Sequence, residues 1–108
     1  MKPLANKLTP LVPSHPGELL KDEIEFRGLS QRKLAAEMEV SYTVLNEILN
    51  GKRPVNVEFA LLIEAALKID ASLLINMQTR YNLQTMRQNA NFAHRMETVS
   101  RKMTISLT

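Results

Sequence analysis

The sequence predicts an all-α protein built from five helices. Apolar residues recur at helical spacing from about residue 16 to residue 89, and a Ser, Asn or Asp stands before most of these segments, where helix N-caps are expected. No internal repeat and no strong strand pattern interrupts this region. These observations together favour a helical bundle.

The first 28 residues predict an extended arm followed by the first helix. Residues 1–14 contain three prolines and no sustained period, so we interpret them as a flexible N-terminal arm. His15 or Ser14 can cap the helix, and Pro16 suits its first position because the missing N–H would be unpaired there anyway. Gly28 can supply a left-handed stop.

Four further helices are predicted between residues 30 and 89. Ser30 caps a helix to about residue 38, and Ser41 caps one to about residue 50 after a turn at residues 39–40. Asn56 can cap a helix over residues 57–69. That helix is apolar around most of its circumference, which predicts a place in the centre of the bundle. Asp70 caps the fifth helix, which runs towards residue 89.

The pattern weakens beyond residue 89. Residues 90–108 mix Asn, Ser, Thr and Arg with scattered Met, which predicts a frayed helix followed by an extended end over residues 103–107. We therefore divide the chain into an arm (1–14), a helical domain (15–89) and a C-terminal extension (90–108).

Composition narrows the class of protein. A length of 108 residues fits one domain, and the absence of cysteine excludes disulfides and thiolate metal sites. No apolar run is long enough to span a bilayer or to form a signal peptide, so we expect a soluble, cytoplasmic protein with no membrane partner. The net charge is +3, with the excess in residues 77–108. This charge permits nucleic-acid binding and does not establish it.

The segment QRKLAAEMEVSYTVLNEI, residues 31–48, carries the functional prediction. Its apolar residues would face one core from two short helices joined by a tight turn, and the small Ala35 stands where those helices must approach closely. Such a pair of helices is typical of DNA-binding proteins, in which the second helix enters the major groove. The same apolar spacing also occurs in helix pairs that bind no DNA.

The polar residues of this segment and its flanks are the candidate DNA contacts. Asn46 is suited to bidentate pairing with adenine, while Thr43 and Tyr42 offer hydroxyl and apolar surface to thymine or phosphate. Glu47 can accept from cytosine or repel the backbone. Base-reading candidates are Tyr42, Thr43, Asn46 and Glu47. Phosphate-contact candidates are Gln31, Lys33, Ser41, Lys52 and Arg53.

Four motifs between His15 and Leu83 resemble the HigA family of antitoxins, within the lambda-repressor-like helix-turn-helix class. The motifs are HPGELL (15–20), SQRKLA (30–35), VSYTVLNEILNGKRPV (40–55) and NMQTRYNL (76–83). The opening HPGE and the NMQTRYNL element indicate the HigA type in particular. The sequence departs from the family at Glu39, where glycine is usual, and at Asn82, where Asp is common.

The resemblance implies a function with two parts. It implies a homodimer that binds a palindromic operator in its own promoter, and that also neutralises a toxin resembling RelE-type mRNA-cleaving ribonucleases. Paired half-sites raise the affinity that one short helix provides. We place the expected dimer surface on the fourth and fifth helices, with a contribution from the tail, and the expected toxin contacts on residues 1–14 and 90–108.

Two other functions remain open at this stage. A stand-alone repressor without a toxin would share every DNA-reading residue. A helical interaction module that has lost DNA binding is favoured by Glu37, Glu39 and Glu47, which phosphate would repel. An enzyme is not expected, because His15 and His94 lie at opposite ends of a chain without cysteine. No glycine-rich phosphate loop is present either, so we expect no cofactor.

Overall fold

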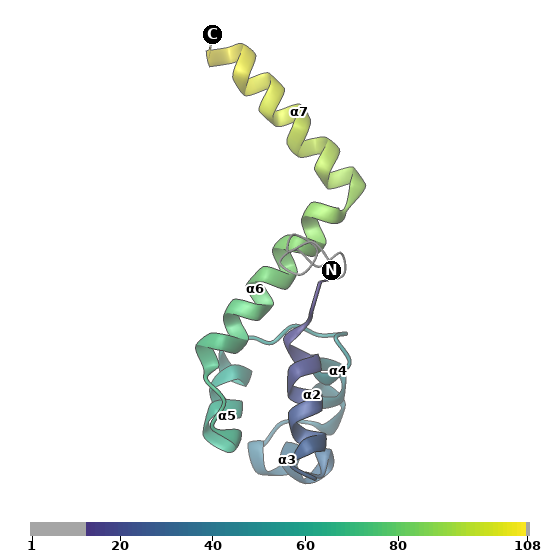
Figure 1. Cartoon of the computed structure of the whole chain (residues 1–108), viewed down its shortest axis with the longest axis vertical. Helices are drawn as coiled ribbons and strands as arrows, with labels where there is room; N and C mark the ends of the chain where they lie inside the picture. Colours follow the sequence, from purple (N-terminus) through teal and green to yellow (C-terminus); the bar gives the residue numbers. More distant parts are fainter. Residues whose placement is uncertain (1–12, 108) are drawn as a thin grey trace, which may run out of the picture.

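The computed structural model describes residues 13–107, and all regular elements in this range are helices. In chain order they are α2 (Pro16–Phe26), α3 (Gln31–Met38), α4 (Tyr42–Leu49), α5 (Val57–Leu67), α6 (Ala71–Gln88) and α7 (Ala90–Leu107), as Figure 1 shows. The all-α prediction is confirmed, and the described residues contain six helices where five were predicted. Most of the predicted arm lies outside the described residues.

Side-chain caps set the starts of the helices, as the sequence indicates. The His15 ring nitrogen Nδ1 accepts from the Gly17 N–H at 2.9 Å, and Pro16 occupies the first position of α2. The predicted caps of the next four helices are Ser30, Ser41, Asn56 and Asp70, and each accepts from a backbone N–H of its helix. Each cap satisfies one of the N–H groups that a helix start leaves unpaired.

The core of the bundle forms where α2, α4, α5 and α6 converge. Its fully buried side chains include Leu20, Leu45, Ile63 and Leu74, one from each of these helices. The start of α2 lies directly against the end of α4: a Cβ built on Gly17 would stand 1.9 Å from the Ile48 carbonyl oxygen. Glycine is therefore required at this close approach of two backbones.

Helix α5 does not lie in the centre of the bundle, contrary to the prediction. Phe59, Ala60 and Ile63 are buried on one face, whereas Leu61 is 52% exposed and the two alanines at 65 and 66 are also exposed. Its backbone ends earlier than predicted, because Lys68 adopts the left-handed conformation (φ 61°) immediately after Leu67. An apolar composition around a whole helix shows that every face of the helix can be buried. It does not show that other parts of the chain pack against every face.

The C-terminal residues form a continuous helix instead of the predicted frayed and extended tail. Asn89 has an extended backbone that ends α6, and its side chain accepts from the Phe92 N–H at 2.9 Å to start α7. α7 projects away from the bundle (Figure 1), so the radius of gyration is 18.1 Å, against about 13 Å for a compact domain of this length. Within residues 13–107, no helix combines the length and apolar content that crossing a bilayer requires.

The contact between α2 and α4 predicts the effect of adding one methyl group. We expect Gly17→Ala to lower the free energy of unfolding by about 3 kcal/mol, because the new Cβ must displace a backbone carbonyl. The matched control is Gly28→Ala, where φ is +66° and nothing lies within 4 Å, so strain alone costs about 1 kcal/mol. Urea denaturation of both variants measures the difference, and equal losses contradict the close-approach argument.

Candidate nucleic-acid interface

Helices α3 and α4 form the predicted pair joined by a tight turn. Glu39 ends α3 in the left-handed conformation with φ of 56°, at the position where the family usually has glycine. Ser41 then caps α4, its Oγ accepting from the Val44 N–H at 3.0 Å. Leu34 and Leu45 are buried, and so is Ala35, only 2% exposed, as expected where the helices approach closely. The turn and the caps orient α4 relative to the bundle.

The outward face of α4 carries the predicted base-reading residues. Thr43 is exposed, while Tyr42, Asn46 and Glu47 are half-buried. Asn46 lies between two helices: its Nδ2 approaches the Gln31 Oε1 at 3.5 Å, and its Oδ1 accepts from the Asn50 Nδ2 at 3.3 Å. The structure thus brings Gln31 and Asn46, predicted separately, into one polar group that limits the rotation of the Asn46 amide.

Glu47 and Arg53 form an ion pair that the sequence analysis did not anticipate. The Arg53 Nε and Nη2 donate to the Glu47 Oε1 at 3.1 and 2.8 Å. Both side chains are partly exposed, at 38% for Glu47 and 49% for Arg53. The pair neutralises the carboxylate that would otherwise repel phosphate, and it leaves Nη1 of Arg53 as a further donor. Glu47 therefore does not exclude a polyanion from this face.

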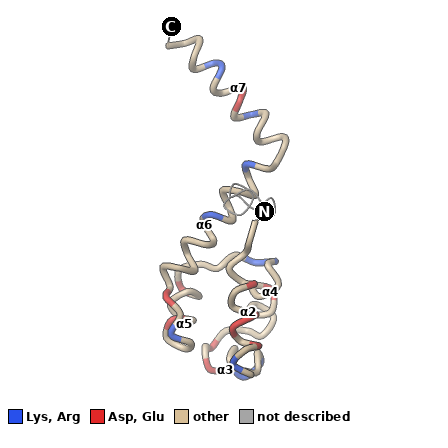
Figure 2. Tube along the Cα trace, in the orientation of Figure 1, with Lys and Arg blue, Asp and Glu red and all other residues tan. Residues whose placement is uncertain are grey.

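Arg32 is a residue of this surface that the sequence analysis missed. Its guanidinium carbon lies 4.1 Å above the centre of the Tyr42 ring, and the ring in turn packs against the core. Both side chains are therefore held at the junction of α3 and α4. Arg32 directly follows Gln31 in the first turn of α3. This neighbouring position could have identified it from the sequence as a residue of the same surface. Figure 2 shows basic residues in α3 and again in the segment after α4.

Two buried polar side chains hold the loop that follows α4. The Gln78 Oε1, in a side chain 5% exposed, accepts from the Val55 N–H at 2.8 Å, and its Nε2 donates to the Asn82 Oδ1 at 2.9 Å. Asn82 accepts through oxygen as an Asp would, so this departure from the family motif preserves the hydrogen bond. The loop carries Lys52, which is exposed beside the end of α4.

His15 is the second buried polar group at this loop. Its ring is 4% exposed and packs edge-on against Tyr81, with ring centres 4.9 Å apart. Gly51 also packs against this ring: a Cβ built on Gly51 would lie 3.7 Å from the His15 Cγ. Burial lowers the pKa of His15 below its ordinary value of 6.5, although a hydrogen bond to the Arg53 backbone and the charge of Glu18 oppose the shift. The HPGE and NMQTRYNL motifs thus meet around one loop.

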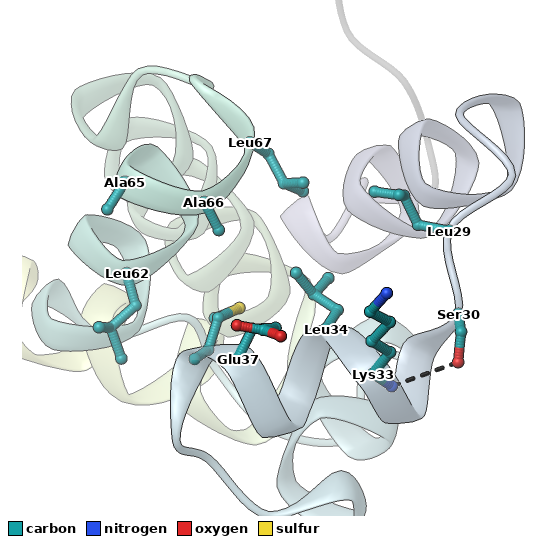
Figure 3. A pocket seen from close by; sticks show the side chains of 10 residues that line it. Leu29, Ser30, Lys33, Leu34, Glu37, Leu62, Ala65, Ala66 and Leu67 are labelled. Atoms are coloured by element: carbon teal, nitrogen blue, oxygen red, sulfur yellow. Dashed lines mark hydrogen bonds between the residues drawn. The ribbon is translucent and has the colours of Figure 1, made fainter.

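Lys33 lies apart from the α4 face, in a groove between α3 and α5. The groove has a volume of about 520 Å³ and an apolar floor that includes Leu34, Met38 and Leu67. Figure 3 shows Lys33 and Glu37 along its α3 side. None of the described lining residues comes from α4. The structure therefore separates Lys33 from the other predicted phosphate contacts, Gln31, Ser41, Lys52 and Arg53.

A family model described as helix-turn-helix matches residues 20–74, about half of the chain. The matched range contains the α3–α4 pair and the loop after it. The chain therefore belongs to the helix-turn-helix family.

Solved structures narrow the similarity to antitoxins of one type. An addiction module antidote protein of the HigA family from Coxiella burnetii is 25% identical with a TM-score of 0.71, covering 80% of this chain and 95% of that chain. Antitoxin HigA of Pseudomonas aeruginosa, solved with the higBA promoter, is 29% identical with a TM-score of 0.71, covering 80% and 92%. These findings confirm the resemblance to HigA-type antitoxins that the motifs indicated.

A curated relative is similar over a shorter range. Virulence-associated protein A′ of Dichelobacter nodosus is 35% identical over 48 residues, which are 44% of this chain and 42% of that protein. The match thus spans less than half the length of that relative.

The lowered pKa of His15 predicts a loss of stability in mild acid. The unfolded chain binds a proton on His15 near pH 6.5, whereas the folded chain binds it only at lower pH. Between these two values the unfolded state binds more protons, so the free energy of unfolding decreases as pH falls and is level above about pH 7. Urea denaturation from pH 5 to 8 measures this slope.

His15→Asn should flatten the slope, because Asn can cap the helix and does not titrate. The matched control is His94→Asn, which replaces an exposed histidine of α7 and should retain the slope. An unchanged slope in His15→Asn rules out this histidine as its source.

Proposed function

We propose that this chain is an antitoxin that binds DNA specifically, represses its own operon as a homodimer and neutralises a RelE-like mRNA-cleaving toxin. The observation that carries the DNA-binding part is the outward face of α4, which carries Thr43 and Asn46. This face lies between the helix start, which Ser41 caps, and the basic loop of residues 51–55, which Gln78 holds through a hydrogen bond. The antitoxin part is supported by the similarity to HigA-type proteins over about four-fifths of the chain.

In this proposal, α4 enters the major groove and its flanks contact phosphate. Thr43 and Asn46 read base edges, with Asn46 exchanging its bond to Gln31 for a bidentate pair with adenine. The released Gln31 amide, the Ser41 end of α4, and Lys52 then lie where the backbone passes. Arg53 contacts phosphate through Nη1 while it stays paired with Glu47. Tyr42 contributes its ring edge and hydroxyl beside Arg32.

Two copies supply the affinity that one α4 lacks. An eight-residue helix with few free cations gives a weak complex, and two half-sites about one DNA turn apart bind together far more tightly. The structure of the Pseudomonas aeruginosa HigA protein with its promoter supports an operator as the DNA target. We therefore expect a palindromic site upstream of the coding sequence.

A lone repressor without a toxin is the second candidate, because it needs the same α4 face. An interaction module without DNA binding is less well supported than the sequence suggested. Its main argument was the acidic residues near α4, and the ion pair with Arg53 neutralises Glu47. Glu37 points into the groove between α3 and α5, away from the α4 face.

The DNA-reading assignment predicts a loss of specificity in a double variant. We expect Thr43→Ala/Asn46→Ala to weaken binding to the upstream DNA at least about 30-fold, because each good base contact contributes roughly 1–3 kcal/mol of discrimination and two are lost. The salt dependence of the remaining binding should be unchanged. Fluorescence anisotropy at several salt concentrations measures both quantities, and Lys52→Ala should reduce the salt slope by about 1.

The matched control is Asn76→Ala/Thr79→Ala, which replaces the same residue types at exposed positions on α6. It should bind as the native chain does. If the native chain prefers its upstream DNA no more than random DNA, the DNA-binding proposal is wrong.

Toxin neutralisation is tested separately from DNA binding. We expect co-expression of the chain to restore growth of cells that express a RelE-like protein encoded beside it. The Thr43→Ala/Asn46→Ala variant should also restore growth, because the proposal assigns the α4 face to DNA alone. A growth assay gives the answer, and failure of rescue by the native chain favours the lone repressor.

A further inference from the structure

Arg32 is an exposed cation of the α3–α4 surface, and its hydrogen-bond donors make no bond within the described chain. No described residue accepts from its guanidinium or forms an ion pair with it. The residues three and four positions away on either side are Gly, Leu and Ala, so α3 offers no carboxylate at the spacing of a helical ion pair. Arg53, by comparison, uses two of its donors on Glu47. All five N–H groups of Arg32 are therefore available to a ligand.

The ring of Tyr42 holds this guanidinium at the start of α4. The Arg32 Cζ lies 4.1 Å from the centre of the ring, and the ring packs against the core. Tyr42 is the first residue of α4, directly after the Ser41 cap. A guanidinium over an aromatic face is restricted in orientation, while the N–H groups along its edge stay available. A cation of α3 is thus presented at the first turn of α4.

A guanidinium in this position suits a base edge better than a phosphate. A phosphate attracts any nearby cation and makes little demand on its orientation. Guanine instead presents O6 and N7 as two acceptors in one plane, and bidentate contact by Arg is the commonest specific contact in the major groove. The N-terminal residues of a reading helix are the ones that reach base edges, and Arg32 lies over the first of them.

We propose that Arg32 reads a guanine of the operator half-site through a bidentate contact to O6 and N7, and that Tyr42 is the positioning residue that holds the guanidinium for this contact. The inference rests on the proposed function for the entry of α4 into the major groove, and it names a base that the DNA target must contain. Asn46 and Arg32 then read two different bases, an adenine and a guanine. Lys33, which lines the groove beside α5, takes no part.

The contact with Tyr42 makes the reading of guanine more favourable without touching the base. An exposed arginine side chain loses much of its rotamer freedom when it binds a ligand. Tyr42 already removes part of that freedom from Arg32, so less is lost when the DNA binds. The stack covers a face of the guanidinium and uses none of its donors. The ring of Tyr42, and not its hydroxyl, is therefore the feature on which the preference for guanine depends.

The experiment replaces each guanine of the upstream DNA in turn by 7-deazaguanine, which keeps base pairing and lacks N7. Fluorescence anisotropy measures binding of the full chain to each duplex. We expect one guanine in each half-site at which this replacement weakens binding of the native chain about 10-fold. Arg32→Ala should bind the unmodified DNA about 10-fold more weakly, and should show no further loss when that guanine is replaced.

The matched control is Lys33→Ala, which removes the neighbouring cation of α3 and should keep the sensitivity to 7-deazaguanine. Tyr42→Phe should also keep it, because the ring remains. Tyr42→Leu should reduce it to about threefold or less, because the side chain still packs on the core and the aromatic face is lost. A merely structural role of Tyr42 would change the affinity for both duplexes and leave their ratio unchanged. Thermal unfolding of each variant shows that the bundle is intact.

The outcomes separate this inference from the proposed function. A native chain that prefers its upstream DNA and is insensitive to every 7-deazaguanine overturns the inference alone. Arg32→Ala that weakens binding to all sequences alike and lowers the salt slope by about 1 also overturns it, and assigns Arg32 to phosphate. Retained sensitivity in Tyr42→Leu overturns the positioning role.

Two further outcomes concern the proposed function. A native chain with no preference for its upstream DNA over random DNA contradicts the proposed DNA binding, and the inference with it. A guanine contact that depends on Arg32, in a chain that does not restore growth against the toxin, supports the inference and contradicts only the antitoxin part.

Discussion

The rest of the structure depends on the position of one irregular loop, residues 51–55, at the end of α4. The loop can occupy this position only if its buried polar groups have hydrogen-bond partners. His15, the N-cap of α2, has a hydrogen bond to the Arg53 backbone of this loop, and Gln78 of α6 accepts from the Val55 N–H. A buried donor without a partner costs about 1–3 kcal/mol, so the loop is stable mainly in the position where both side chains reach it. The same contacts hold the start of α2 against the end of α4, where Gly17 permits the close approach. One polar cluster therefore positions the candidate reading helix and its basic flank together.

The side chains of the candidate interface are held by contacts within the chain. Asn46 is bonded to Gln31 and Asn50, Glu47 to Arg53, and Arg32 lies over Tyr42. Restricting these side chains lowers the entropy that binding must remove, but DNA has to replace some of their internal hydrogen bonds. The net gain from one copy is consequently small. The projecting helix α7 lies away from the α4 face and carries exposed apolar side chains, among them Met96, Val99 and Met103.

The interface could be predicted in part from the sequence. The placement of Thr43 and Asn46 on the outer face followed from helical periodicity, and a turn was predicted at residues 39–40, where Glu39 adopts a positive φ. The pairing of Glu47 with Arg53 could not be predicted, because it depends on how the loop after α4 folds back beside that helix. Lys33 was grouped with the phosphate contacts because it is close in sequence, whereas the helix turns it into the groove beside α5. The direction of a side chain depends on how its helix packs, which the residue type does not reveal.

The sequence by itself determined the all-α class, the starts of five helices and the residues that α3 and α4 direct towards the core. These features depend on capping bonds and spacings within a few residues, which act in the same way wherever the segment lies. The tertiary structure alone decided that α5 has an exposed apolar face, that α7 is a projecting helix, and that the HPGE and NMQTRYNL motifs meet at one loop. Burial and pairing depend on residues far away in the chain, and local propensity carries no information about which of them become neighbours.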